Sequence, residues 1–218
     1  MRAVFETGFY YLYLLFIIGM GIYLLIKKKN ILFALACILL GLGDAFHLIP
    51  RAIGLYTKTL DNPSPTLAMY LGVGKLVTSI TMTIFYVLLY LFIYKRISKK
   101  RNIYLDIIVC LLFIARITLL CFKQNEWTIN GGTVYWGIYR NIPFVLLGIL
   151  VIVLLFLYFR KEKYFSLMWI AVILSFLFYL AVVIFASKYS WVGMMMLPKT
   201  MCYIWIGVMG LLDAKKTE

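Results

Sequence analysis

The sequence predicts an all-α polytopic membrane protein, a bundle of seven transmembrane helices forming a single domain over residues 1–218. Hydrophobic residues make up 65% of the chain and the mean hydropathy is +0.98, more apolar surface than a water-soluble domain of this size needs. These residues fall into seven runs of about 19–28 residues, each long enough to cross a hydrocarbon core of about 30 Å as a helix. Basic residues also alternate between rich and poor connections, as expected for helices that cross a membrane in turn.

The seven apolar runs follow one another with short polar connections. The first run has no strong basic segment before it and no small-residue cleavage site after it, so we expect a retained helix and not a signal peptide. The third run is the longest of the set. The runs cover residues 8–26, 31–50, 67–94, 103–121, 138–159, 164–186 and 192–212.

The connections predict the orientation of the chain. Cytoplasmic loops of membrane proteins are enriched in Lys and Arg. We therefore expect the N-terminus outside and the C-terminus in the cytoplasm of a cell-membrane protein, and no nucleic-acid partner. The rich connections hold Lys27, Lys28, Lys29, Lys95, Arg96, Lys99, Lys100, Arg101, Arg160, Lys161, Lys163, Lys215 and Lys216, whereas the poor ones hold Arg2, Lys58, Lys123 and Lys188.

The two longer outer connections carry turn signals. Residues 61–65 read Asp-Asn-Pro-Ser-Pro, which breaks a helix. Residues 130–132 read Asn-Gly-Gly, which suits a tight turn in a short hairpin or lid. Nearby Trp127, Tyr135 and Trp136 are typical of anchors at a membrane interface.

One segment of the second run carries three ionisable side chains. At about 100° per residue, Asp44, His47 and Arg51 lie within about 60° of one another on a helix. His47 is the single histidine of the chain. Ionisable groups are costly in hydrocarbon and mark functional sites by default. The competing interpretation is a structural hydrogen bond between Asp44 and His47 that stabilises the bundle.

With Arg51, five basic positions fall within or at the ends of the apolar runs, all in the predicted outer half of the membrane. Lys75, for example, lies about 12 Å in from the start of its run. Its helical face continues through Thr78, Ser79 and Met82, and that of Lys199 continues through Tyr203. A polar stripe on a membrane helix faces the bundle interior or a water-filled cavity. The five positions are Arg51, Lys75, Arg116, Arg140 and Lys199.

We therefore expect a cavity open to the outside, lined by Asp44, His47 and up to five cations, with a net charge of about +4. Unpaired cations at this depth are costly unless an anion visits them, which implies a phosphate, a carboxylate or a lipid head group. Snorkelling of each cation to the interface is the alternative. The candidate catalytic residues are Asp44 and His47, and the candidate ligand-binding residues are Arg51, Lys75, Ser79, Arg116, Arg140, Lys199 and Tyr203.

The spacing of Asp44 and His47 suits proton transfer, since residues three apart on a helix are neighbours. A Ser-His-Asp arrangement with Ser79 lacks a nucleophile elbow. One histidine, scattered acids and no clustered cysteines offer too few ligands for a metal, which also excludes hydrolases that bind zinc through several histidines. The four cysteines read as small buried apolar residues. Lys199 in the seventh run suggests a retinal Schiff base, but the aspartate that usually precedes it in microbial rhodopsins is absent, so we expect no cofactor.

The second run resembles a known family. Residues 43–50 read Gly-Asp-Ala-Phe-His-Leu-Ile-Pro, similar to the Gly-Asp-x-x-x-Leu-x-Pro motif of the lysoplasmalogenase (YhhN-type) membrane hydrolases. Tyr70 to Gly74 is similar to their next, glycine-containing helix. The resemblance implies cleavage of a lysoplasmalogen vinyl ether, with the catalytic role on Asp44. The chain departs from the family in having seven runs instead of eight, in lacking the late Ser-Asp motif, and in having Thr78–Thr83 where a histidine is expected.

Two classes of function follow. One is a membrane enzyme that adds water to an anionic amphiphile, with Asp44 and His47 transferring protons. The other is a transporter or sensor of an anionic solute, in which the same pair couples binding to protons or gates it with pH. Its partners would be membrane lipids and an anionic small molecule or lipid head group.

Overall fold

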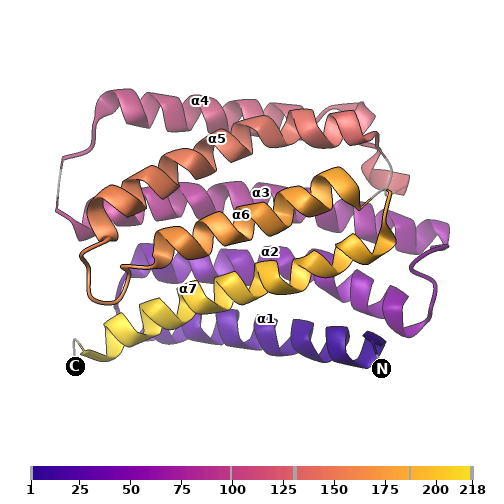
Figure 1. Cartoon of the computed structure of the whole chain (residues 1–218), viewed down its shortest axis with the longest axis horizontal. Helices are drawn as coiled ribbons and strands as arrows, with labels where there is room; N and C mark the ends of the chain where they lie inside the picture. Colours follow the sequence, from indigo (N-terminus) through magenta and orange to yellow (C-terminus); the bar gives the residue numbers. More distant parts are fainter. Residues whose placement is uncertain (1, 99, 130–131, 187, 217–218) are drawn as a thin grey trace.

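The computed structural model describes residues 2–98, 100–129, 132–186 and 188–216, and in them it is helical with no strand (Figure 1). Seven spans are long and apolar enough to cross a membrane. The prediction of an all-α integral membrane protein with seven such helices is therefore confirmed. The helices are α1 (Arg2–Ile26), α2 (Ile31–Tyr56), α3 (Pro65–Arg96), α4 (Ile103–Leu120), α5 (Val134–Phe159), α6 (Met168–Phe185) and α7 (Met196–Lys216).

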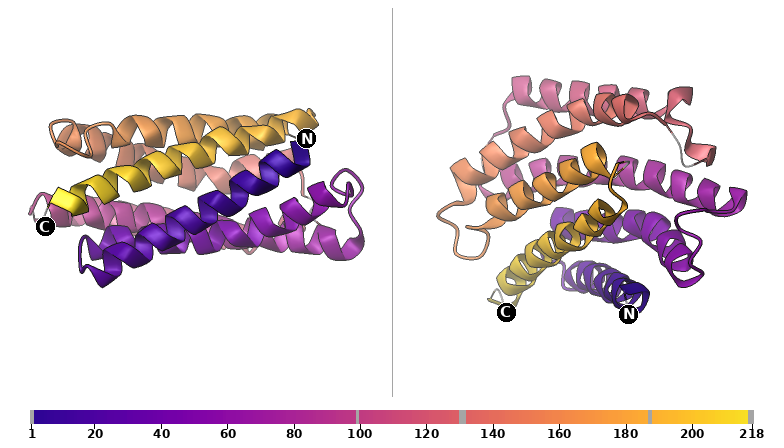
Figure 2. Two further views of the ribbon diagram at one scale, coloured as in Figure 1. Left: turned by 90° about the horizontal axis from the view of Figure 1, so that it is seen from below. Right: turned by 45° about the vertical axis from the view of Figure 1, so that its right-hand side comes forward.

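The helices pack side by side in a closed bundle. Each contacts the next in sequence, and α1 also packs against α7, so that the first and last helices meet. The helix α3 occupies a central place because it contacts α2, α4 and α5. Figures 1 and 2 show α1 and α4 at opposite edges of the bundle.

The two ends of the bundle differ in charge. The connections 27–30, 97–102 and 160–167 lie at the same end as the C-terminus, at the left of Figure 1. We call this the basic end, because it gathers the connections rich in Lys and Arg. The N-terminal helix start and the other three connections lie at the opposite end.

A polar network ties the basic end together around Asp213 of α7. Its carboxylate accepts two hydrogen bonds from Arg96, at 2.6 and 3.0 Å, and one from Asn30 at 2.8 Å. Arg96 also lies 3.6 Å from Glu162. Four chain segments are therefore linked around this buried carboxylate, and the segment that contains Glu162 joins through Arg96. Near this end, Arg101 lies 3.6 Å from Asp106.

Several helix boundaries differ from the sequence prediction. The helix α1 begins at Arg2 and not at residue 8, and α2 continues through Pro50 to Tyr56 instead of ending at residue 50. Proline removes one backbone donor, but a membrane helix tolerates this where neighbouring helices cover the freed carbonyl. The extra turn keeps Arg51 on the same helix as Asp44 and His47. At the other extreme, α6 begins at Met168 and not at 164.

The connection between α4 and α5 contains no strand in its described residues, so these residues do not form the expected hairpin. Instead two short 3₁₀ helices occupy Lys123–Asn125 and Trp127–Ile129, and the second packs against α3. Asn130 and Gly131 of the expected turn lie outside the described residues, whereas Gly132 adopts a positive φ of 90°. Trp127 is half-buried and donates to the carbonyl of Leu120 at 2.9 Å, which ties it to the loop.

The cysteines are all free, but they are not uniformly buried. Cys37 and Cys202 are buried as expected, whereas Cys110 and Cys121 are exposed. Both exposed residues belong to α4 or its cap, the helix at the edge of the bundle, most of whose surface faces outward.

The closest helix contact brings α2 against α3 through two glycines. The hydroxyl of Thr78 donates to the carbonyl of Gly43 at 2.9 Å. A methyl group added at Gly74 would collide with the backbone carbonyl of Phe46 and lie 2.9 Å from the Cα of His47. Small residues allow membrane helices to approach in this way. The contact places His47 directly beside the start of the polar face of α3.

Replacing Gly74 by alanine should therefore push the two helices apart. We expect Gly74→Ala to lower the free energy of unfolding by about 1–3 kcal/mol, the usual cost of overpacking. Gly19→Ala is the matched control, because nothing lies within 4 Å of a methyl group there. Thermal denaturation in detergent would measure both variants, and equal Tm values would contradict a tight α2–α3 contact.

Candidate functional site

A cavity of about 490 Å³ opens within the bundle and collects the charged residues of five helices. Its wall includes Gly132 and Gly193, from the connections before α5 and α7, so the cavity lies at the end opposite the basic end. Seven of the nine residues predicted for the site line it. They are His47, Arg51, Lys75, Ser79, Arg116, Arg140 and Lys199.

Asp44 and Tyr203 lie behind the cavity wall, outside its lining. The Asp44 carboxylate is buried and accepts a hydrogen bond from the Tyr13 hydroxyl at 2.7 Å. Tyr203 is buried as well, and its hydroxyl accepts a hydrogen bond from Ser175 at 2.9 Å. Both residues therefore form a second layer that supports the wall.

His47 reaches the cavity with a free ring nitrogen. The side chain is 8% exposed, and Nδ1 has no hydrogen-bond partner among the described residues. The Asp44 carboxylate bonds to Tyr13, so the direct Asp44–His47 hydrogen bond considered as a structural alternative does not form. Lys75, Arg51 and Lys199 all act on the imidazole electrostatically.

Arg51 has its own counter-ion. Its guanidinium lies 3.6 Å from the buried carboxylate of Glu6, and its Nε donates to the Tyr10 hydroxyl at 3.1 Å. The Tyr10 hydroxyl in turn donates to Glu6 at 3.0 Å. Arg51 is thus held on α1 and does not snorkel to the membrane surface.

Arg116 is the least expected member of the wall. It is 1% exposed, and its Nε and Nη1 have no hydrogen-bond partner among the described residues. Its guanidinium lies 5.3 Å from the ring centre of Phe144, a cation–π distance. A buried guanidinium with unused donors is costly, because those donors have lost water without gaining a partner.

Arg140 is held by the connection between α4 and α5. Its Nη1 donates to the Asn125 side chain at 2.8 Å, and its guanidinium stacks 4.5 Å from the centre of the Trp127 ring. Asn125 is fully buried and donates to three backbone carbonyls, which gives the loop its shape. The loop therefore orients Arg140 toward the cavity.

The two lysines have different surroundings. Lys199 is buried, with its ammonium 4.9 Å from the centre of the Tyr179 ring, and it attracts the Asp44 carboxylate. Lys75 is half-buried and is repelled by Arg140 and Arg51. Ser79 donates to the Lys75 carbonyl at 2.7 Å, so its hydroxyl proton is not directed at His47. A Ser-His-Asp nucleophile is therefore not assembled.

Counting the carboxylates corrects the expected charge of the cavity. Five cations line it, and Asp44 and Glu6 compensate two of them. The formal excess is three positive charges with neutral histidine, one fewer than predicted. The apolar part of the wall comes mainly from α5 and from α6 with its cap, through Phe144, Val182, Val183 and Ala186.

Comparison with known proteins finds no matching family model, curated protein or solved structure. The site is thus interpreted from its own chemistry. Among the described residues no group of three His, Cys, Asp or Glu side chains could hold a metal ion.

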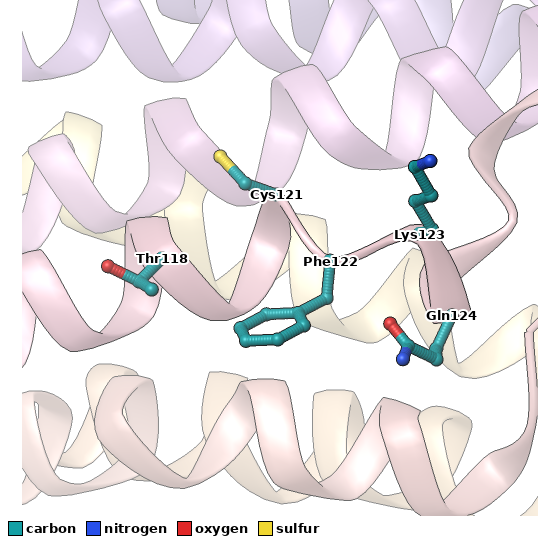
Figure 3. Close-up of a pocket in the computed structure, with 5 residues that line it drawn as sticks. All are labelled: Thr118, Cys121, Phe122, Lys123 and Gln124. Atoms are coloured by element: carbon teal, nitrogen blue, oxygen red, sulfur yellow. The ribbon is translucent and has the colours of Figure 1, made fainter.

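A second hollow lies at the end of α4 (Figure 3). It is shallow, and the side chains that border it point in different directions and share no charge partner. We assign it no role. Its lining is Thr118, Cys121, Phe122, Lys123 and Gln124.

Four residues that shape the site were not among those predicted: Glu6, Tyr13, Asn125 and Tyr179. Glu6 had a usable signal, since it is an acid within one helical turn of an apolar run on the same side as the cations. Tyr13 and Tyr179 stand among many aromatic residues, and no sequence feature distinguishes them. Asn125 is placed by tertiary contacts.

Because two donors of Arg116 are unpaired, we expect this residue to lower the stability of the ligand-free protein. Arg116→Met should raise the free energy of unfolding of the ligand-free protein by about 1–4 kcal/mol, since replacing buried charge by an apolar side chain is often stabilising. Arg51→Met should lower it, because Glu6 then loses a cation. Denaturation of the two variants in the same detergent compares them directly. Destabilisation of the same size in both would mean that Arg116 is a structural cation.

Proposed function

We propose that this protein is an integral membrane protein that binds an anionic ligand in the cavity, which faces the outside of the cell membrane. The observation that carries the proposal is Arg116, a buried guanidinium whose Nε and Nη1 face no partner in a cavity with excess positive charge. These two atoms are closed off in the empty cavity, and an anion that enters would supply their partners once the guanidinium turns toward it. Such a site is pre-organised and costs stability until it is filled.

The orientation in this proposal rests on the basic end. Loops rich in Lys and Arg stay in the cytoplasm. Because the cavity lies at the opposite end of the bundle, it would open outward, to an extracellular solute or to the head groups of the outer leaflet. The apolar wall beside the cations suits a lipid head group as well as a small organic anion.

A hydrolase of the lysoplasmalogenase type is a second candidate, favoured by the free Nδ1 of His47 at the wall. In this proposal Asp44 gives a proton to the vinyl carbon, and His47 takes a proton from the water that adds to the neighbouring carbon. The resulting hemiacetal breaks down to an aldehyde and the alcohol that carries the head group, which Arg116 and Lys75 hold. To reach the ligand, Asp44 would have to break its hydrogen bond to Tyr13. Otherwise its charge would act on the ligand only indirectly, through its electrostatic interaction with Lys199. In a transporter or sensor, the same Asp44 and His47 would respond to protons.

Binding tests the main proposal. Calorimetric titration of the purified protein with phosphate, sulfate and octanoate should detect at least one of these anions. Arg116→Gln should weaken that binding at least about tenfold, as expected when a charge-assisted hydrogen bond in a closed site is lost. Lys161→Gln at the basic end makes the same change in charge and should leave it unaltered. Identical affinities in the two variants would place the anion elsewhere.

Turnover and transport separate the two candidates. In proteoliposomes, His47→Gln and Asp44→Asn should abolish hydrolysis of a lysoplasmalogen but leave anion binding intact if the protein is an enzyme. If it is a transporter, the same variants should remove the pH dependence of uptake while exchange persists. Variants that behave like the wild type in both assays would refute the roles given to Asp44 and His47.

A further inference from the structure

We infer that the charged group recognised in the cavity is a phosphate monoester, a dianion, and not a monovalent carboxylate or a zwitterionic phosphodiester. The inference rests on the proposed function and specifies the chemistry of its ligand. It follows from which cations lack counter-ions, from the number of donors they offer and from the way they are held.

Three of the five cations form an uncompensated group. Among the described residues, neither Lys75, Arg116 nor Arg140 makes an ion pair with a carboxylate, whereas Arg51 and Lys199 have Glu6 and Asp44 nearby. Arg140 repels both Lys75 and Arg116, so the three act on one another. We call them the cation triad. A monovalent anion would leave two of these positive charges without compensation, and a zwitterion would add a positive charge of its own.

The donors of the triad suit an acceptor with several oxygens. Arg116 offers its free Nε and Nη1, and Lys75 offers an ammonium with three N–H bonds. Thr78 and Tyr179 also line the cavity, but their hydroxyl protons are donated to the Gly43 carbonyl and to Asn141, so the donors for a ligand come from the triad. A phosphate monoester presents three strong acceptor oxygens and nearly two negative charges, whereas a carboxylate presents two oxygens and one charge. Arginine in particular is favoured where phosphate oxygens are bound.

Two members of the triad, Arg116 and Arg140, are held in place before any ligand arrives. Each cation comes from a different helix: α3, α4 and α5. Asn125 and Trp127 orient Arg140, and Phe144 lies against Arg116. A surface lysine cluster would have the freedom to move apart, but Arg140 and Arg116 are held, so the repulsion between them persists in the empty cavity. A dianion between them removes it.

The apolar wall lies next to the triad, since Phe144 touches Arg116 and lines the same cavity as Val182 and Val183. The phosphate could therefore belong to a membrane lipid or to a soluble ester. The charged group is the same in both, and the experiment separates the two sources.

Calorimetric titration of the full-length protein in detergent at pH 8, where a phosphate monoester is a dianion, tests the inference. The probes are octyl phosphate, octanoate, octyl phosphocholine and glycerol phosphate. We expect octyl phosphate to bind at least about tenfold more tightly than octanoate and octyl phosphocholine, given a second charge-assisted contact. Glycerol phosphate as tight as octyl phosphate would indicate a soluble ester, and much weaker binding a lipid.

Variants connect this preference to the triad. Lys75→Gln and Arg140→Gln should each reduce the ratio of phosphate to carboxylate affinity toward one, whereas Lys161→Gln should preserve it. Lys75→Gln is the safer variant, because Lys75 does not shape the connection that holds Arg140. Equal affinity of the wild type for octyl phosphate and octanoate would overturn the inference but leave anion binding intact. Binding of none of the anions would refute the proposed function itself.

Discussion

Five positive charges lie within one apolar bundle, and much of the structure near the cavity is arranged around the cost of keeping them there. An isolated cation in hydrocarbon is costly, and a cluster of like charges adds repulsion. The bundle compensates in three ways: by carboxylates placed one layer behind, by aromatic rings against the cationic groups, and by amide side chains. Glu6, Asp44 and Asn125 provide the polar partners, and Tyr179 and Trp127 provide rings.

This compensation leaves some buried hydrogen-bonding atoms unpaired. It fully satisfies neither Arg116 nor His47, both of which keep unused hydrogen-bonding atoms in a cavity. Elsewhere the same chain pairs its buried charge well. The Asp213 carboxylate accepts two hydrogen bonds from Arg96 and one from Asn30. The contrast between the two ends supports the proposal that the unpaired groups await a ligand, because the chain pairs buried charge where it can.

The two ends of the bundle also differ in how their helices are held. The Asp213 network joins four segments at the basic end and fixes the helices there, while the opposite end separates far enough to form the cavity. The helix α3 links the two, because it carries Lys75 near one end and Arg96 at the other. The glycine contact between α2 and α3 sets how close His47 comes to Lys75.

The sequence by itself determined the class of the protein, the number of apolar spans and the cations that line the cavity. Hydropathy and length decide these, because a helix that crosses a membrane must be apolar over a known distance, so each charge within it stands out. Lys75, Arg116 and Lys199 could be selected on that ground alone.

Only the tertiary structure decided how these charges are partnered. Glu6 meets Arg51, and Tyr13 meets Asp44, across helices whose relative rotation no single-helix pattern contains. The same rotation moved Asp44 and Tyr203 behind the wall while their helical neighbours reached the cavity. A periodic pattern gives the face of one helix, whereas the depth of a side chain in a cavity depends on how the neighbouring helices pack against that face.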